Sequence, residues 1–165
     1  MTVRPILRHP DTRLRAIAAP VNAFDDALKA LAEEMVATMY AAPGRGLAAP
    51  QIGVMQRVFV MDADWKNSGV RAPCMMVNPR IAAASNRFQT LDEGCLSIPG
   101  VVVPVRRPAE VTLRWQDLHG EWHEQRFDGF SAACVQHERD HLDGVLCIDH
   151  LDDAERHAAM DGYRE

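Results

Sequence analysis

The motif His137-Glu-Arg-Asp-His141 constrains this chain more than any other part of its sequence. It lies in a run from about Gly129 to about Asp143 that we predict to be one helix. Histidines four residues apart on a helix lie on the same face, so both imidazoles can bind one ion. Glu138 lies between them and can accept a proton from a water on that ion. The motif alone also fits an ordinary amphipathic helix whose histidines bond to backbone or carboxylate partners.

The rest of the chain predicts one catalytic domain, residues 1–165, of the α+β class. A second helix is expected from Asp25 to Ala42, because apolar residues recur there at helical spacing between a capping aspartate and Pro43. Strands are expected at residues 57–62, 73–79, 87–91, 101–105, 111–115 and 121–127, the last two forming a hairpin. We therefore expect short, mostly antiparallel strands packed around the motif helix of the C-terminal half, plus an N-terminal helix.

The shorter segments carry weaker patterns. Residues 11–14 favour a helical turn, and residues 65–69 favour a polar loop. Residues 93–99 interrupt the strand pattern, and residues 145–148 favour a short strand or extended segment. The charged tail that follows is expected to be frayed.

The composition of the chain argues against several classes of protein. The chain has a net charge of −5 and no basic cluster, which gives no support to direct nucleic-acid binding. No stretch approaches the roughly 20 apolar residues that a membrane helix needs, and the N-terminal residues lack an apolar signal core. The four cysteines show no paired spacing of a zinc finger or redox motif, so we expect reduced thiols. These features favour a soluble, cytoplasmic protein without membrane contact.

Two histidines leave a catalytic metal site incomplete, because such sites usually take three protein ligands and one water. Cys95 is the foremost candidate, since it lies in a non-periodic break where the backbone could bend around an ion. Cys134 is the main rival, because it lies three residues before His137 and near the same helix face. Its place in the apolar run 130–135 also fits a packed thiol.

Three stretches together resemble the signature motifs of the peptide deformylase family. They are Gly44-Arg-Gly-Leu-Ala-Ala-Pro-Gln51, Glu93-Gly-Cys-Leu-Ser97 and Gln136-His-Glu-Arg-Asp-His141, in the family's order and with similar spacing. The resemblance implies an enzyme that removes the formyl group from the N-terminal formyl-methionine of newly made chains and releases formate. Its partners would be N-formylmethionyl nascent peptides, with transient association with the ribosome.

The resemblance also assigns roles to residues. It implies that Cys95, His137 and His141 hold one divalent metal ion. Fe(II) is the usual native ion, and Zn(II), Ni(II) and Co(II) are the alternatives. Gln51 and the backbone amide of Leu96 would donate hydrogen bonds to the oxyanion.

The resemblance also implies that Glu138 carries the proton during the reaction, which agrees with its position between the two histidines of the helix.

The substrate pocket is where this chain departs from common family patterns. Arg45, beside Gly46, stands where many relatives have a small aliphatic residue near the substrate's first side chain. Val102 stands where many relatives place an arginine. Apolar residues on the face of the motif helix that carries His137 are predicted to line the pocket for the substrate's methionine side chain. These residues are Phe130, Ala133 and Cys134.

Two other functions share part of this pattern. A metallopeptidase of the zincin type has the same His-Glu-x-x-His helix but typically takes its third ligand downstream. Here the residues after His141, including His150, do not supply the extended zincin pattern. A non-catalytic protein that keeps the metal site for binding or stability is the other alternative.

Overall fold

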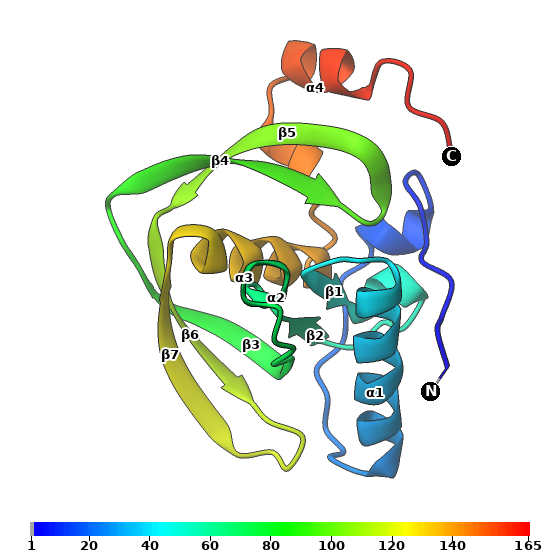
Figure 1. Cartoon of the computed structure of the whole chain (residues 1–165), viewed down its shortest axis with the longest axis vertical. Coiled ribbons are helices and arrows are strands. Elements are labelled where there is room, and N and C mark those ends of the chain that lie inside the picture. The colour runs from blue at the N-terminus through cyan, green and yellow to red at the C-terminus, as the bar shows by residue number, and fades with distance from the viewer. Residues whose placement is uncertain (1) are drawn as a thin grey trace.

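The computed structural model describes residues 2–165, and these form four α-helices and two antiparallel sheets (Figure 1). The helices are α1 (Asp26–Ala41), α2 (Trp65–Ser68), α3 (Gly129–Leu142) and α4 (Asp153–Met160). The strands are β1 (Gly46–Ala48), β2 (Val58–Met61), β3 (Cys74–Ala84), β4 (Phe88–Cys95), β5 (Ile98–Pro108), β6 (Glu110–Gln116) and β7 (Trp122–Asp128). Three 3-10 helices complete the set: Thr12–Arg15, Ala49–Ile52 and Cys147–His150. The expected α+β class with antiparallel strands is confirmed.

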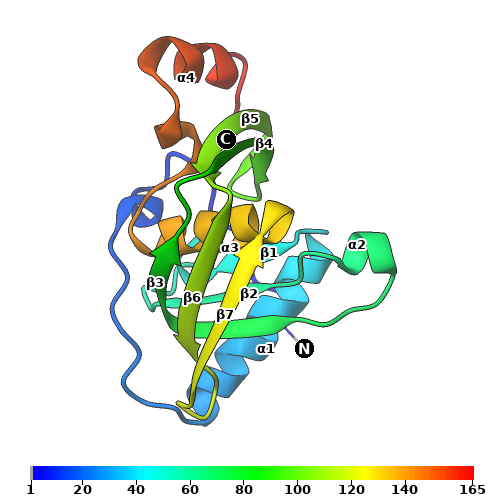
Figure 2. The same cartoon turned by 90° about the vertical axis from the view of Figure 1, so that its left-hand side faces the viewer.

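The two sheets lie on either side of α3. The larger sheet has the strand order β1-β2-β3-β6-β7, and the smaller is the β4-β5 hairpin. Figures 1 and 2 show α3 between them, with α1 beside the β1 and β2 end of the larger sheet. The motif helix is thus enclosed by strands from both halves of the chain.

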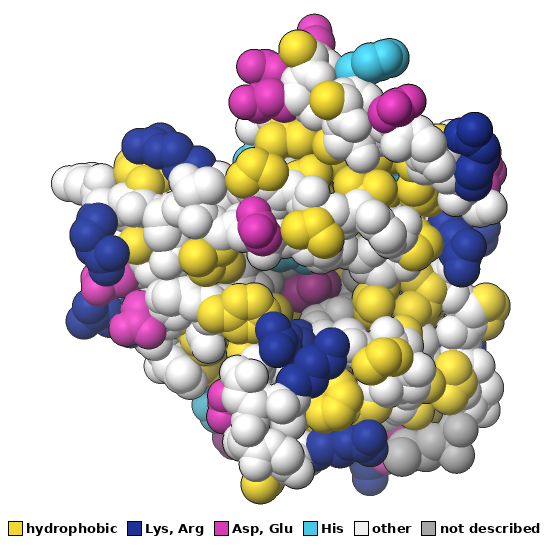
Figure 3. Space-filling view, turned by 45° about the horizontal axis from the view of Figure 1, so that its top comes forward, with side chains coloured by type: hydrophobic (Ala, Val, Ile, Leu, Met, Phe, Trp, Pro, Cys, Tyr) yellow, Lys and Arg dark blue, Asp and Glu magenta, His cyan; other side chains and the backbone are white. Residues whose placement is uncertain are grey.

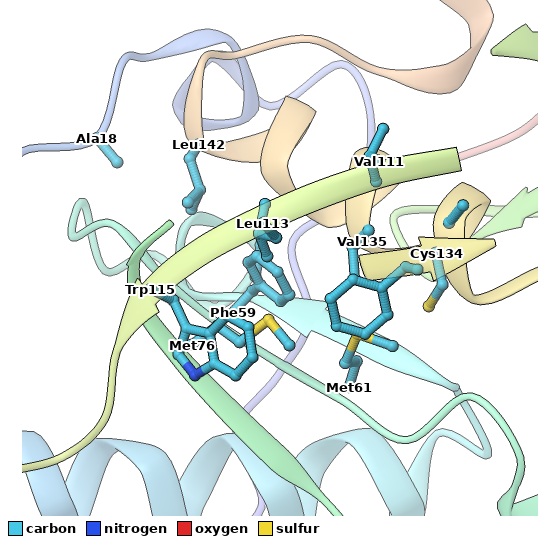
Figure 4. Packing of buried hydrophobic residues seen from close by; sticks show 13 residues of the cluster. Ala18, Phe59, Met61, Met76, Val111, Leu113, Trp115, Cys134, Val135 and Leu142 are labelled. Atoms are coloured by element: carbon cyan, nitrogen blue, oxygen red, sulfur yellow. The ribbon is translucent and has the colours of Figure 1, made fainter. Parts of the chain in front are cut away.

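The helix α3 is held by an apolar cluster on the larger sheet. Val135 and Leu142 of the helix are fully buried against Phe59, Met76 and Leu113 of the strands (Figure 4). Burying each such side chain contributes roughly 1.5–3 kcal/mol. This packing fixes one face of α3 and leaves the face with the motif histidines toward the β4-β5 hairpin.

The predicted N-terminal helix is confirmed. The carboxylate of Asp25 caps α1 by accepting a hydrogen bond from the amide of Leu28 at 3.1 Å. Leu28, Met35 and Met39 are buried at helical spacing in a second apolar cluster, which also includes Leu47 from β1.

The structure corrects four of the local predictions. Residues 65–69 form the short helix α2 and its glycine cap where a polar loop was expected. The strand pattern continues through residues 93–95 and resumes at Ile98, so only a short turn interrupts it. Residues 145–148 are no strand: the Asp149 carboxylate accepts from the Leu146 amide at 2.8 Å and closes a 3-10 turn. The charged tail is ordered as α4, because Asp152 and Glu155 form a capping box.

Among residues 2–165, no helix combines the length and the apolar character that crossing a bilayer requires.

Candidate active site

Three buried donor atoms meet where α3 faces the end of β4. The Sγ of Cys95 and one ring nitrogen each of His137 and His141 all lie within 4.8 Å of one another. Cys95 is the last residue of β4, and its pairing with Ile98 places it beside a tight turn. The structure thus places the sulfur of Cys95 with the histidines, although Cys95 lies 42 positions before His137 in the sequence. The other candidate, Cys134, does not belong to this group of donor atoms.

The donor set fits a divalent transition-metal ion. One thiolate and two imidazoles are the ligand types that such ions take in catalytic sites. Metal bonds of about 2.3 Å to sulfur and 2.0 Å to nitrogen at a tetrahedral angle separate the two atoms by about 3.5 Å. The Sγ of Cys95 lies 3.4 Å from the Nε2 of His141. The residues therefore have both the chemistry and the spacing for one ion.

The electrostatic surroundings favour the thiolate form of Cys95. Burial by itself raises the pKa of this thiol, but the charge of His141 and hydrogen bonds from both imidazoles outweigh it. The net pKa lies well below the ordinary value for cysteine. Since the thiolate is the form that binds metal, the pocket prepares Cys95 as a ligand. Burial raises the pKa of Cys134 to about 12, so that thiol stays protonated.

A buried ion-pair network orients His137, and sequence reasoning did not single it out. The Nδ1–H of His137 donates to the Oε1 of Glu93 at 2.8 Å. Arg107 binds both oxygens of Glu93, at 2.6 and 2.9 Å, and reaches Asp140 at 2.9 Å. Such partners fix the tautomer and direction of a metal-binding imidazole. One signal was available: Arg107 continues the inward alternation of the β5 valines at 101, 103 and 105.

Glu138 faces the cavity with unsatisfied hydrogen-bonding capacity. Its side chain is buried, and its Oε2 has no hydrogen-bond partner among residues 2–165. Burial raises the pKa of this carboxyl group. Gly46 lies so close that a Cβ there would be 2.5 Å from the Oε1 of Glu138, so any larger residue would displace the Glu138 side chain. A buried carboxylate with a raised pKa suits proton transfer near neutral pH.

Gln51 and Leu96 lie at the edges of the donor set. The Oε1 of Gln51 accepts from the Ala48 amide at 2.9 Å, and its Nε2 donates to the Oγ of Ser97 at 3.0 Å. The same nitrogen lies 3.7 Å from the Sγ of Cys95, so its second N–H points toward the donor set. Leu96 lies in the turn between β4 and β5 and lines the cavity.

A cavity of about 760 Å³ opens onto this site. Figure 3 shows the hollow, with an acidic side chain inside it and Lys or Arg side chains along its lower margin. All five residues predicted to bind substrate line the cavity: Arg45, Gly46, Phe130, Ala133 and Cys134. The Arg45 guanidinium lies over the Phe130 ring, 4.8 Å from its centroid.

Comparisons with known proteins agree with the motifs. The family model described as polypeptide deformylase matches residues 3–157. A peptide deformylase of Novosphingobium aromaticivorans is 42% identical over 97% of this chain and 95% of its own. One from Phenylobacterium zucineum is 47% identical over 97% and 94%.

Solved structures show the same fold. A peptide deformylase from Legionella pneumophila superposes with a TM-score of 0.91 at 41% identity, covering 97% of this chain and 92% of its own. One from Synechococcus elongatus, in complex with actinonin, gives 0.91 at 36% identity, covering 99% and 91%. Matches of this extent to both sequence and fold confirm the resemblance seen in the three motifs, and the chain belongs to the polypeptide deformylase family.

Proposed function

We propose that this chain is a metal-dependent hydrolase that removes the formyl group from N-formylmethionyl ends of newly made polypeptides. The observation that carries the proposal is the buried set of Cys95, His137 and His141, with Glu138 beside it in a cavity of substrate size. We assign the reaction to one catalytic domain, residues 1–165, acting in the cytoplasm on nascent chains in transient association with the ribosome. The family relationship supports the assignment of the hydrolase activity.

Cys95, His137 and His141 would hold one divalent ion, which we propose to be Fe(II), with Zn(II), Ni(II) and Co(II) as the alternatives. When bound, such an ion supplies acidity, because it lowers the pKa of a coordinated water toward about 7. The remaining chemistry is done by the chain's own residues. Glu93 and Arg107 hold the His137 side chain in place. Metal analysis of anaerobically purified protein would identify the bound ion.

The proposed hydrolysis needs a proton carrier and hydrogen-bond donors for the developing oxyanion. Glu138 accepts a proton from the attacking water and delivers it to the amine nitrogen as the formyl carbon–nitrogen bond breaks. The water oxygen leaves in formate. The second N–H of Gln51 and the backbone N–H of Leu96 donate to the formyl oxygen, and each well-aimed donor is worth roughly 3 kcal/mol.

The metallopeptidase alternative is not favoured. Its third ligand would lie downstream of the motif, but the structure brings Cys95 from upstream to the two histidines. The downstream His150 instead bonds to Asp140, with 2.9 Å between Nε2 and Oδ2.

One assay separates the three functions. The protein is incubated with formyl-Met-Ala-Ser and, separately, with an unblocked peptide. Formate release supports the proposal, internal cleavage of the unblocked peptide supports a peptidase, and neither product indicates a non-catalytic protein.

The cavity predicts a preference for methionine. Ala133 and Cys134 are buried in its wall and Phe130 is partly exposed there, so a thioether side chain can be covered. Burying it contributes roughly 2–3 kcal/mol, which corresponds to about 30-fold to 150-fold. Formyl-Met peptides should exceed formyl-Ala peptides by this factor in kcat/KM. Equal values in steady-state kinetics would reject the methionine pocket.

Val102 predicts weak binding of the peptide backbone. Val102 lines the cavity, is 65% exposed and can donate no side-chain hydrogen bond. Val102→Arg should therefore lower KM and leave kcat nearly unchanged, as added uniform binding does. Steady-state kinetics on one formyl-Met peptide measures both constants, and an unchanged KM in the variant would contradict this role.

A further inference from the structure

The cavity carries positive charge that no carboxylate of the described chain neutralises. Four basic side chains line it, and Arg4 is paired with Glu34 at 2.8 Å. The other three, Arg8, Arg45 and Lys66, form no ion pair within residues 2–165. Unpaired cations in a concave site attract anionic ligands.

Arg45 and Lys66 lie on one wall of the cavity, which we call the basic wall. The guanidinium of Arg45 rests on Phe130, and its Nε is buried with no hydrogen-bond partner in the described chain. The ammonium of Lys66 lies 5.7 Å from the centroid of the Trp65 ring. Trp65 is joined to the neighbouring loop, since its Nε1 donates to the carbonyl of Gly44 at 3.0 Å. Aromatic faces thus support both cations and leave terminal N–H groups free to donate.

The carboxylates that line the cavity do not neutralise the positive charge of the basic wall. Glu93 is buried and bound by Arg107, and Glu138 lies deep at the reaction site. Asp92, in β4, is exposed and forms no ion pair with Arg45 or Lys66. Within residues 2–165, neither cation of the basic wall forms an ion pair with a carboxylate.

The basic wall is also close to the reacting groups. A Cβ at Gly46 would touch Glu138, and Arg45 is the residue before Gly46, with Cα atoms about 3.8 Å apart. An extended peptide rises about 3.3 Å per residue, so its second and third residues pass within reach of a long basic side chain.

We propose that Arg45 and Lys66 determine specificity, favouring formyl-Met peptides that carry an acidic side chain at their second or third residue. This inference rests on the proposed function and names the substrate class within it. The carboxylate would accept hydrogen bonds from the guanidinium and ammonium groups. The gain would appear in KM, since the contact lies away from the bond that breaks.

The test compares amidated peptides that differ at one position. Formyl-Met-Glu-Ala-amide and formyl-Met-Ala-Glu-amide are each measured against their Gln and Lys counterparts. With two surface-type ion pairs, we expect the better Glu peptide to exceed its Gln counterpart about fivefold in kcat/KM, and its Lys counterpart by more. The preference should shrink in about 0.5 M salt, because exposed charges are screened there.

Variants identify the groups responsible. Arg45→Gln and Lys66→Gln should each reduce the Glu-to-Gln ratio, and the double variant should bring it to about one. Arg45→Lys should keep part of the preference. Arg114→Gln is the matched control, because Arg114 also stacks on an aromatic ring, Trp122, but does not line the cavity. The ratio is taken within each variant, so a general loss of activity cancels.

The outcomes separate this inference from the proposed function. Formate release with equal rates for Glu and Gln peptides, or a preference unchanged in the double variant, would overturn the basic wall alone. No formate from any peptide would contradict the proposed function, and the inference would fall with it.

Discussion

Glu138→Ala should keep its metal ion and lose at least about 10²–10⁴-fold in kcat, the range typical of losing an acid–base catalyst. The loss is larger if Glu138 also positions the attacking water. Metal binding should survive because the donor group consists of Cys95, His137 and His141 and does not include Glu138.

Stability gives this prediction a second readout. Glu138 is a buried carboxyl group whose Oε2 has no partner in the described chain, so the fold loses no hydrogen bond at that atom. Removing such a group relieves desolvation, and we expect a melting temperature equal to or above that of the wild type. Glu138→Gln is the matched control, since it keeps the shape that packs against Gly46 and removes the acid.

Metal content and kinetics are measured on the same preparations. Loss of metal in both Glu138 variants, with melting curves intact, would mean that Glu138 is a ligand and would contradict its role as proton carrier.

Cys95→Ala should abolish stoichiometric metal binding, whereas Cys134→Ala should leave about one ion per chain. Cys95 is a buried thiol whose pKa is lowered by His141 and the hydrogen bonds from both imidazoles, despite its desolvation. The Cys95→Ala substitution removes the thiolate, which is the only charged ligand among the three. Cys134 stays protonated, with its pKa raised to about 12 by burial, and its thiol contacts the Arg45 carbonyl at 3.8 Å.

The two cysteines make a matched pair, because both are buried and both line the cavity. Elemental analysis of protein purified without oxygen gives the ion content of each variant, and circular dichroism checks the fold. Equal metal loss in the two variants would show that Cys95 is not the distinguishing ligand.

Several features followed from the sequence because they depend on local periodicity. The helix α1 was expected at 25–42 and spans Asp26–Ala41, and the motif helix was expected at 129–143 and spans Gly129–Leu142. The hairpin of β6 and β7 was likewise predicted from the alternating strand pattern on either side of the turn at Asp117. Family membership followed from three motifs whose order and spacing are properties of the chain itself.

Weak local patterns were less reliable. A few apolar residues at 145–148 fit a strand as well as a turn, and the Asp149 carboxylate decided for the 3-10 turn. The tail became helical because Asp152 and Glu155 cap it. The Tyr163 hydroxyl after the helix donates to the carbonyl of His9, across 154 residues of sequence. The spacing of Asp152 and Glu155 is a sequence signature of such a cap, whereas the contact between Tyr163 and His9 could not be inferred from the sequence.

The tertiary structure alone decided which groups meet at the site. Cys134 is three residues from His137 in sequence, yet it is Cys95, across the turn from Ile98, that joins the histidines. Arg107 reaches Glu93 and Asp140 only because β5 places it on the inner face of the hairpin. Sequence periodicity tells which face of an element is buried, but not which faces of distant elements come together. That choice depends on packing between α3 and the two sheets, which sets the donor group and the cavity beside it.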